Sequence, residues 1–131
     1  MDYSQLSDFE VNGLVASLTQ KTGDYTQARE KTFIHEFADA GEFKGVCIGW
    51  KEYDPCNNPA DAWQIIVANL IEVSPDYDFT DESEQELCAT GLWTANHVEV
   101  DGKSYYQSHQ NPLRAAMIVF LMMQDKANAN P

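Results

Sequence analysis

The hydrophobic positions are most concentrated towards the C-terminal end of the chain. After Arg114, the nine residues Ala115–Met123 carry no polar side chain. A helix that is apolar on every side is surrounded by the rest of its domain. Asn111 precedes the run as a candidate N-cap, and Pro112 suits the first helical position because no N–H is needed there. The pattern predicts a central buried helix over Asn111–Gln124.

Two other segments have the pattern of amphipathic helices. In Ser7–Gln20, Ser7 and Glu10 stand at capping-box spacing. Apolar residues recur there at the helical interval, at Val11, Leu14, Val15 and Leu18. The second helix begins with Asn58 as cap and Pro59 at the first position, and continues over Ala60–Ile71. Its predicted apolar face consists of Trp63, Ile66, Val67 and Leu70.

Signals for strands are weaker, with one exception. Asp101-Gly102, the dipeptide that a two-residue type I′ turn prefers, separates Leu92–Val100 from Lys103–His109 and predicts a hairpin. Phe43–Tyr53 has the composition of a strand or extended segment. Tyr25–Gly41 fits a helical face or a short strand, because its centre has β propensity, and we take it as a short helix.

The segment Asp76–Glu86 is acidic. It holds six carboxylates in eleven residues and no basic residue. Such a run is typical of solvated chain, so we expect a loop here.

These elements define an α+β fold. A small antiparallel sheet would pack against the central buried C-terminal helix, with the two amphipathic helices completing the shell. At 131 residues the chain is long enough for one core. We expect a single globular domain over residues 1–125 and a frayed tail over residues 126–131.

Charge narrows the range of partners. The chain has 21 acidic and 8 basic residues, a net charge of −13. A surface of this sign repels nucleic-acid phosphates and anionic membranes, and it favours basic partners or solubility alone. Cys47, Cys56 and Cys88 follow no signal peptide, so we expect free thiols in a reducing cytoplasm.

Catalytic motifs are not recognisable in the chain. It has no G-x-S-x-G, no Walker loop and no G-x-G-x-x-G, and the acidic segment lacks the residue order of an EF-hand. The cysteines and histidines form no metal-binding pair of the usual spacing. We therefore expect no enzymatic activity, no metal and no cofactor.

One short motif occurs twice. It reads Asn58-Pro59-Ala60-Asp61-Ala62 and Asn111-Pro112-Leu113-Arg114-Ala115, each time at a predicted helix start. Free backbone N–H groups and the helix dipole attract anions at such starts. Arg114 would either add a positive charge for a phosphate or carboxylate, or pair with Asp61. Four aromatic residues would wall a pocket beside it or belong to the core: Tyr53, Trp63, Trp93 and Tyr105.

Three segments resemble a known family. N-P-A-D-A-W-Q-I-I at 58–66 and N-P-L-R-A-A-M-I-V-F-L-M-M at 111–123 are similar to the signature segments of the phage NinX family, and so is the opening M-D-Y-S-Q-L-S-D-F-E. Gln64 departs from the family, which often has proline after the tryptophan. The resemblance implies a small accessory protein of tailed bacteriophages, made in the host bacterial cytoplasm. It implies no established activity.

Two functional hypotheses follow. The first is a non-enzymatic accessory protein that acts against a host process or defence system by binding a small anionic or nucleotide-like ligand. Its binding residues would be Asn58, Asp61, Trp63, Trp93, Asn111 and Arg114. Arg114→Ala would then abolish binding and leave the fold cooperative. The alternative is an acidic protein–protein inhibitor, including a nucleic-acid mimic that occupies a basic host protein. A homo-oligomer is compatible with both.

Overall fold

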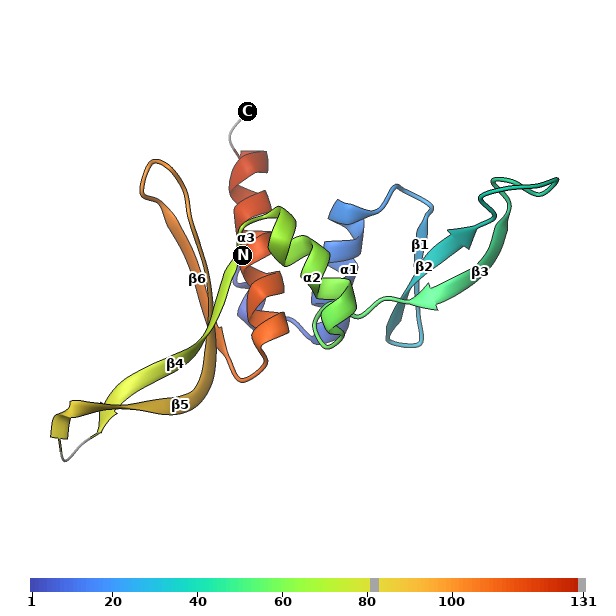
Figure 1. The fold of residues 1–131 in the computed structure, drawn as a ribbon. Coiled ribbons are helices and arrows are strands. Elements are labelled where there is room, and N and C mark those ends of the chain that lie inside the picture. The colour runs from blue at the N-terminus through green and yellow to red at the C-terminus, as the bar shows by residue number, and fades with distance from the viewer. Residues whose placement is uncertain (81–82, 130–131) are drawn as a thin grey trace.

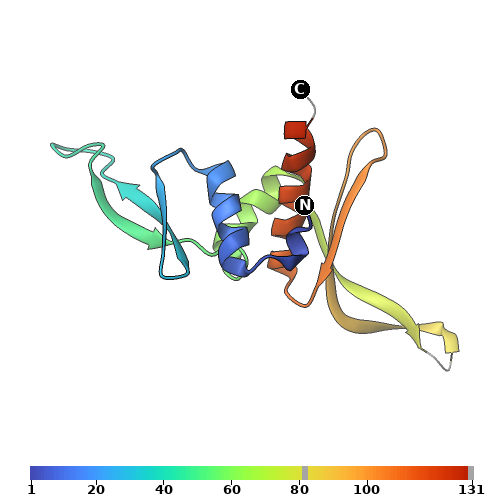
Figure 2. The same cartoon turned by 180° about the vertical axis from the view of Figure 1, so that it is seen from behind.

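Three α-helices form the centre of the protein, within residues 1–80 and 83–129 that the structure describes, and two three-stranded antiparallel sheets project from them on opposite sides (Figures 1 and 2). This computed structural model confirms the predicted α+β class. Its elements in chain order are a 3-10 turn (Tyr3–Gln5), α1 (Asp8–Thr19), β1 (Tyr25–Ala28), β2 (Lys31–Phe37), β3 (Cys47–Glu52), α2 (Pro59–Ala68), β4 (Glu72–Thr80), β5 (Ser83–Val98), β6 (Ser104–His109) and α3 (Pro112–Ala129).

Helix α3 is the central helix that the apolar run predicted. Every residue of Ala115–Leu121 is buried, because α1, α2 and the β4–β6 sheet surround it. The helix is longer than predicted, since it continues past Gln124 to Ala129. Residues 130 and 131 of the expected tail lie outside the described residues, so fraying there stays a prediction.

The other two helices begin where the capping signals indicated. The Ser7 Oγ accepts a hydrogen bond from the Glu10 N–H, and the Glu10 carboxylate accepts one from the Ser7 N–H, each at 3.2 Å. Asn58 caps α2 by accepting from the Ala60 N–H at 3.0 Å. In α1 the side chains of Val11 and Val15 are fully buried.

The segment predicted as a short helix over Tyr25–Gly41 is instead a hairpin of β1 and β2. Strand β2 alternates, so Thr32 is buried on one face and the Phe33 ring lies on the other, against Trp50 of β3. A period of two residues thus places these apolar side chains better than a helical face does. The strand or extended segment predicted over Phe43–Tyr53 is confirmed in part as β3 (Cys47–Glu52), which pairs with β2.

The turn between β1 and β2 is strained. Arg29 and Glu30 have φ values of 54° and 64°, the left-handed pair that a type I′ turn requires. Neither residue tolerates this region as asparagine or glycine does. We expect Arg29→Asn with Glu30→Gly to raise the free energy of unfolding by about 1 kcal/mol, measured by urea denaturation. Gly102→Ala, at a glycine with φ of 89° and open space around it, should change stability in the opposite direction. Equal stability of the Asn-Gly variant and the wild type would contradict the strain argument.

At Gly13 of α1, the β1–β3 sheet packs closely against the helices. The Gln27 side chain lies so close to Gly13 that a Cβ there would come within 2.4 Å of its amide nitrogen. From this position Gln27 donates to the Phe9 carbonyl at 3.0 Å and to the Thr32 hydroxyl at 3.1 Å. Glycine at position 13 therefore lowers the helix propensity of α1, but it allows strand β1 to pack closely against the helix.

The acidic segment is a hairpin rather than the predicted loop. Asp76 and Asp78 belong to β4, and Glu84 and Glu86 belong to β5. Asp81 and Glu82 lie outside the described residues. Apolar residues between the carboxylates, Phe79 and Leu87, are paired across the two strands. Their alternation with charge is a strand pattern that the density of carboxylates obscured.

The predicted hairpin around Asp101-Gly102 is confirmed as β5 and β6. Its turn is not type I′, because Gly102 has a positive φ and Asp101 does not. The Gly102 N–H donates to the Glu99 carbonyl, and the Glu99 N–H donates to the Lys103 carbonyl. This is a three-residue loop with glycine at the left-handed position.

Candidate functional site

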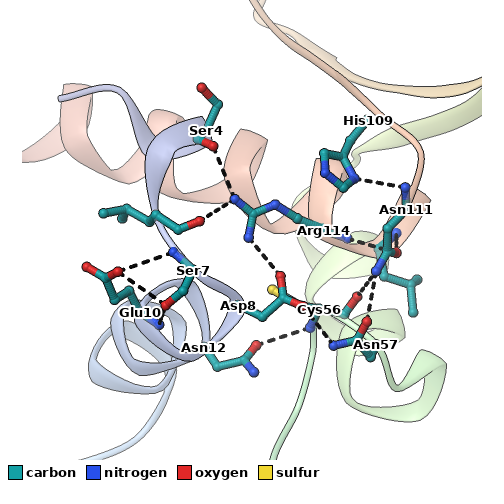
Figure 3. Close-up of polar contacts among 12 residues, drawn as sticks. Ser4, Ser7, Asp8, Glu10, Asn12, Cys56, Asn57, His109, Asn111 and Arg114 are labelled. Carbon is teal, nitrogen blue, oxygen red and sulfur yellow. Dashed lines mark hydrogen bonds and ion pairs between the residues drawn. The ribbon is translucent and has the colours of Figure 1, made fainter. Parts of the chain in front are cut away.

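Asn111 connects the start of α3 to the loop before α2. Its Oδ1 accepts from the backbone N–H groups of Leu113 and Arg114, at 3.0 and 3.3 Å, as an N-cap does (Figure 3). Its Nδ2 donates to the Cys56 carbonyl at 2.7 Å and to the Asn57 Oδ1 at 2.9 Å. Both ends of the amide are thus bound to protein.

The guanidinium of Arg114 points towards the N-terminal segment. Its Nη1 lies 2.7 Å from a carboxylate oxygen of Asp8, and its Nη2 donates to the carbonyls of Ser4 and Leu6 (Figure 3). Arg114 is only 7% exposed. The sequence left open a pair with Asp61, and the partner is Asp8 at the start of α1 instead, while Asp61 accepts from the Asp54 N–H.

This contact changes the acidity of Asp8. Partial burial would raise the pKa of this carboxyl, but hydrogen bonds from Asn57 and Arg114 and the charge of Arg114 outweigh burial and lower it. The folded pKa lies below the unfolded one, so the ionised Asp8 stabilises the fold above about pH 4. This stabilisation is lost as the pH falls through the folded pKa.

We expect Asp8→Asn to flatten part of the acid dependence of stability. The difference in the free energy of unfolding between wild type and variant should be largest near neutral pH and should shrink below about pH 4. Urea denaturation at several pH values measures it. Asn57→Ala removes another hydrogen bond to Asp8, so it should also make the free energy of unfolding less dependent on pH in the acid range. Parallel pH profiles of wild type and Asp8→Asn would rule out this linkage.

The loop between β3 and α2 is held by a second set of hydrogen bonds. Asn12 donates to Asp54 at 2.8 Å and accepts from the backbone N–H of Cys56 at 3.1 Å. Cys56 is fully buried, and burial raises the pKa of its thiol. The thiolate needed for nucleophilic chemistry is therefore disfavoured at this position.

The predicted polar residues do not converge on one pocket. Asp61 accepts from the Asp54 N–H at 2.9 Å and lines a cavity of about 500 Å³ with Glu36, Lys51 and Gln64. Tyr53 lines the same cavity. Asn58, Asn111 and Arg114 belong to the capping and ion-pair contacts. Whether any of them binds a ligand stays a prediction.

Two predicted aromatic residues do come together. Trp63 of α2 and Trp93 of β5 line a groove of about 560 Å³, which we call the apolar groove. Every lining residue is apolar; the remaining ones are Ile66, Val67, Leu70, Ile71, Val73, Pro112 and Leu113. Trp63 is 64% exposed and Leu70 is 80% exposed. The groove is thus an exposed apolar surface between α2, the β4–β6 sheet and the start of α3.

Of the apolar face predicted for α2, only Ile66 is buried, and Trp63, Val67 and Leu70 are exposed along the groove. Ala62 and Ile65 complete the core side of the helix. A signal was present in the sequence, since Ala62–Ala68 has only one polar residue, Gln64. A helix with apolar residues on two faces has more apolar surface than the core on one side of it can bury.

The fold and the groove define a small α+β domain with an exposed apolar site beside its central helix. The chain belongs to the family described as Bacteriophage P22, NinX, which matches residues 2–124. Neither a curated protein nor a solved structure matches the chain. Within the described residues, no helix is long and apolar enough to cross a membrane.

Proposed function

We propose that this chain is a non-enzymatic phage accessory protein that acts in the host cytoplasm by binding a host protein. The apolar groove would hold apolar side chains of that partner. The observation that supports this proposal is the exposure of Trp63 and Leu70 on a surface with no polar lining residue. Exposed apolar surface of this kind is typical of interaction sites, and tryptophan is enriched among residues that dominate binding energy.

The contacts of Arg114 favour a protein partner over a small anion. Its guanidinium already binds Asp8 and two carbonyls, and the Asn111 amide is satisfied at both ends. An anion placed in the groove would lose water and gain no charged donor from the lining residues. The anionic-ligand hypothesis therefore stays a prediction, and native mass spectrometry of protein purified from its host tests it directly.

The charge of the chain suggests the chemistry of the partner. The β4–β5 hairpin carries Asp76, Asp78, Glu84 and Glu86 away from the helices (Figure 1). A partner with apolar anchor residues among basic ones would match both surfaces. Complementary charge would mainly speed association and make it dependent on salt.

A nucleic-acid mimic is the second candidate, because the carboxylates lie on a projecting hairpin. In that case the hairpin, and not the groove, would carry the affinity. Asp76→Asn with Asp78→Asn would then abolish capture of a basic host protein, whereas a groove variant would have little effect. The two candidates thus predict opposite ranking of the same two variants.

The experiment compares matched variants in the phage host. Tagged wild type, Trp63→Glu and Val100→Ser are purified from cells at low salt, and co-purified proteins are quantified by mass spectrometry. Val100 is a fully exposed apolar residue outside the groove, so it controls for loss of surface hydrophobicity. We expect a host protein that wild type and Val100→Ser enrich and Trp63→Glu does not.

Binding is then measured with the purified pair. The far-UV spectrum and melting temperature of Trp63→Glu show whether the variant is folded. A folded Trp63→Glu protein that binds the partner as tightly as wild type would exclude the groove. A small molecule that co-purifies with wild type in native mass spectra, and that is missing from spectra of Arg114→Lys, would support the anionic-ligand hypothesis instead.

A further inference from the structure

A second apolar surface lies at the far end of the β1–β3 sheet. Strand β2 places Phe33 and His35 beside Trp50 of β3, with ring centroids 6.0 and 4.9 Å apart, and His35 stacks nearly parallel to Trp50. Ile48 lies on the same face as Trp50, because side chains two residues apart in a strand share a face. We call Phe33, His35, Ile48 and Trp50 the aromatic face. It is the face opposite to the buried Thr32.

This part of the sheet is exposed to an unusual degree. All six residues of β3 are exposed. Two residues of the aromatic face are exposed, Ile48 at 66% and Trp50 at 54%, and Phe37, whose ring centroid lies 6.5 Å from that of His35, is 42% exposed. At about half of their full area, these three residues contribute on the order of 100 Å² each, or about 300 Å² together. This is comparable to the largest apolar patch on a typical monomer, and it is below the area that one partner buries in a stable complex, so the expected dimer is weak.

We infer that the aromatic face binds the same face of a second copy of this chain. Two such faces would pack as the two sheets of a sandwich do, across a two-fold axis. The surface is chemically self-complementary, because apolar aromatic and aliphatic side chains of one copy would pack against the same side chains of the other. This inference does not rest on the apolar groove, which lies on the other side of the helices.

The distribution of charge favours this contact between identical chains. Residues 21–53, which contain the whole β1–β3 sheet, have five basic and six acidic residues, a net charge of −1. The rest of the chain therefore carries −12. Two acidic copies associate most readily through their least charged surface. The acidic β4–β5 hairpin projects from the opposite side of the helices, so the two hairpins would be far apart in the dimer (Figures 1 and 2).

Analytical ultracentrifugation of the full chain tests the inference. Wild type is expected to pass from monomer to dimer between about 1 and 500 µM, as an interface of this modest area implies. Ile48→Lys should weaken association at least tenfold, because two lysines would enter the interface. Val100→Lys adds the same charge at another exposed apolar position and should leave association unchanged.

Two further variants keep the test decisive. Ile48→Thr keeps strand propensity, so it should fold even if Ile48→Lys does not, and it should also weaken the dimer. Trp63→Glu alters the apolar groove and should dimerise as wild type does. A wild type that stays monomeric over the whole range overturns the inference. So does a dimer that Trp63→Glu disrupts and the Ile48 variants do not.

Discussion

Replacing Arg114 with alanine is expected to lower the free energy of unfolding by about 3 kcal/mol, the lower end of what breaking a buried ion pair costs. The loss leaves the carbonyls of Ser4 and Leu6 without this donor and removes the cationic partner of Asp8. The Asp8 side chain is 44% exposed and can be hydrated, which keeps the estimate at the lower end. Because domains are stable by only about 5–15 kcal/mol, this is a large effect.

The sequence suggested that Arg114→Ala leaves the fold cooperative, and the buried contacts of Arg114 add that the cooperative fold becomes less stable. Urea denaturation measures the change as a lower midpoint with an unchanged slope. Arg114→Lys is the matched variant, because it keeps the charge but replaces the planar fork, whose Nη1 binds Asp8 and whose Nη2 binds the two carbonyls, with a single nitrogen. It should lose an intermediate amount of stability. An Arg114→Ala protein as stable as wild type would show that the guanidinium is not a structural group.

Leu70→Gly should make the protein more stable and at the same time weaken its binding to a partner. Leu70 follows α2 with a φ of 53°, at the position where helices usually end in glycine. The Ile71 N–H donates to the Ile66 carbonyl, and the Leu70 N–H donates to the Val67 carbonyl, as in a Schellman motif. Glycine there relieves about 1 kcal/mol of backbone strain.

A leucine that is both strained and exposed is explained if its side chain has a partner. Removing it from the apolar groove should weaken binding about tenfold or more, because Leu70 is an apolar lining residue with 80% of its surface exposed to a partner. Thermal melting measures the gain, and titration with the identified partner measures the loss. Val67→Ala removes apolar surface from the same groove and leaves the left-handed backbone at Leu70 unchanged. It should therefore weaken binding without raising stability. Unchanged affinity of Leu70→Gly for the partner would show that the Leu70 side chain does not contribute to binding.

The elements that the sequence predicted best are those with local causes. Asn111, Asn58 and Ser7 cap helices through bonds to residues two or three positions away, and such spacing is visible in a linear chain. The run Ala115–Leu121 has no polar side, so its burial followed from its composition. The β5–β6 hairpin followed from a glycine at a turn, although the turn type did not.

Tertiary structure alone decided the partners of long-range contacts. Arg114 binds Asp8, 106 residues away, because α1 and α3 pack side by side; Asp61 was an equal candidate in the sequence. Both sides of α2 are apolar in the sequence, and only the packing of α2 against α3 decided that Ala62, Ile65 and Ile66 are buried while Trp63 and Val67 stay exposed. Periodicity identifies which residues share a face, whereas the arrangement of neighbouring elements determines what that face contacts.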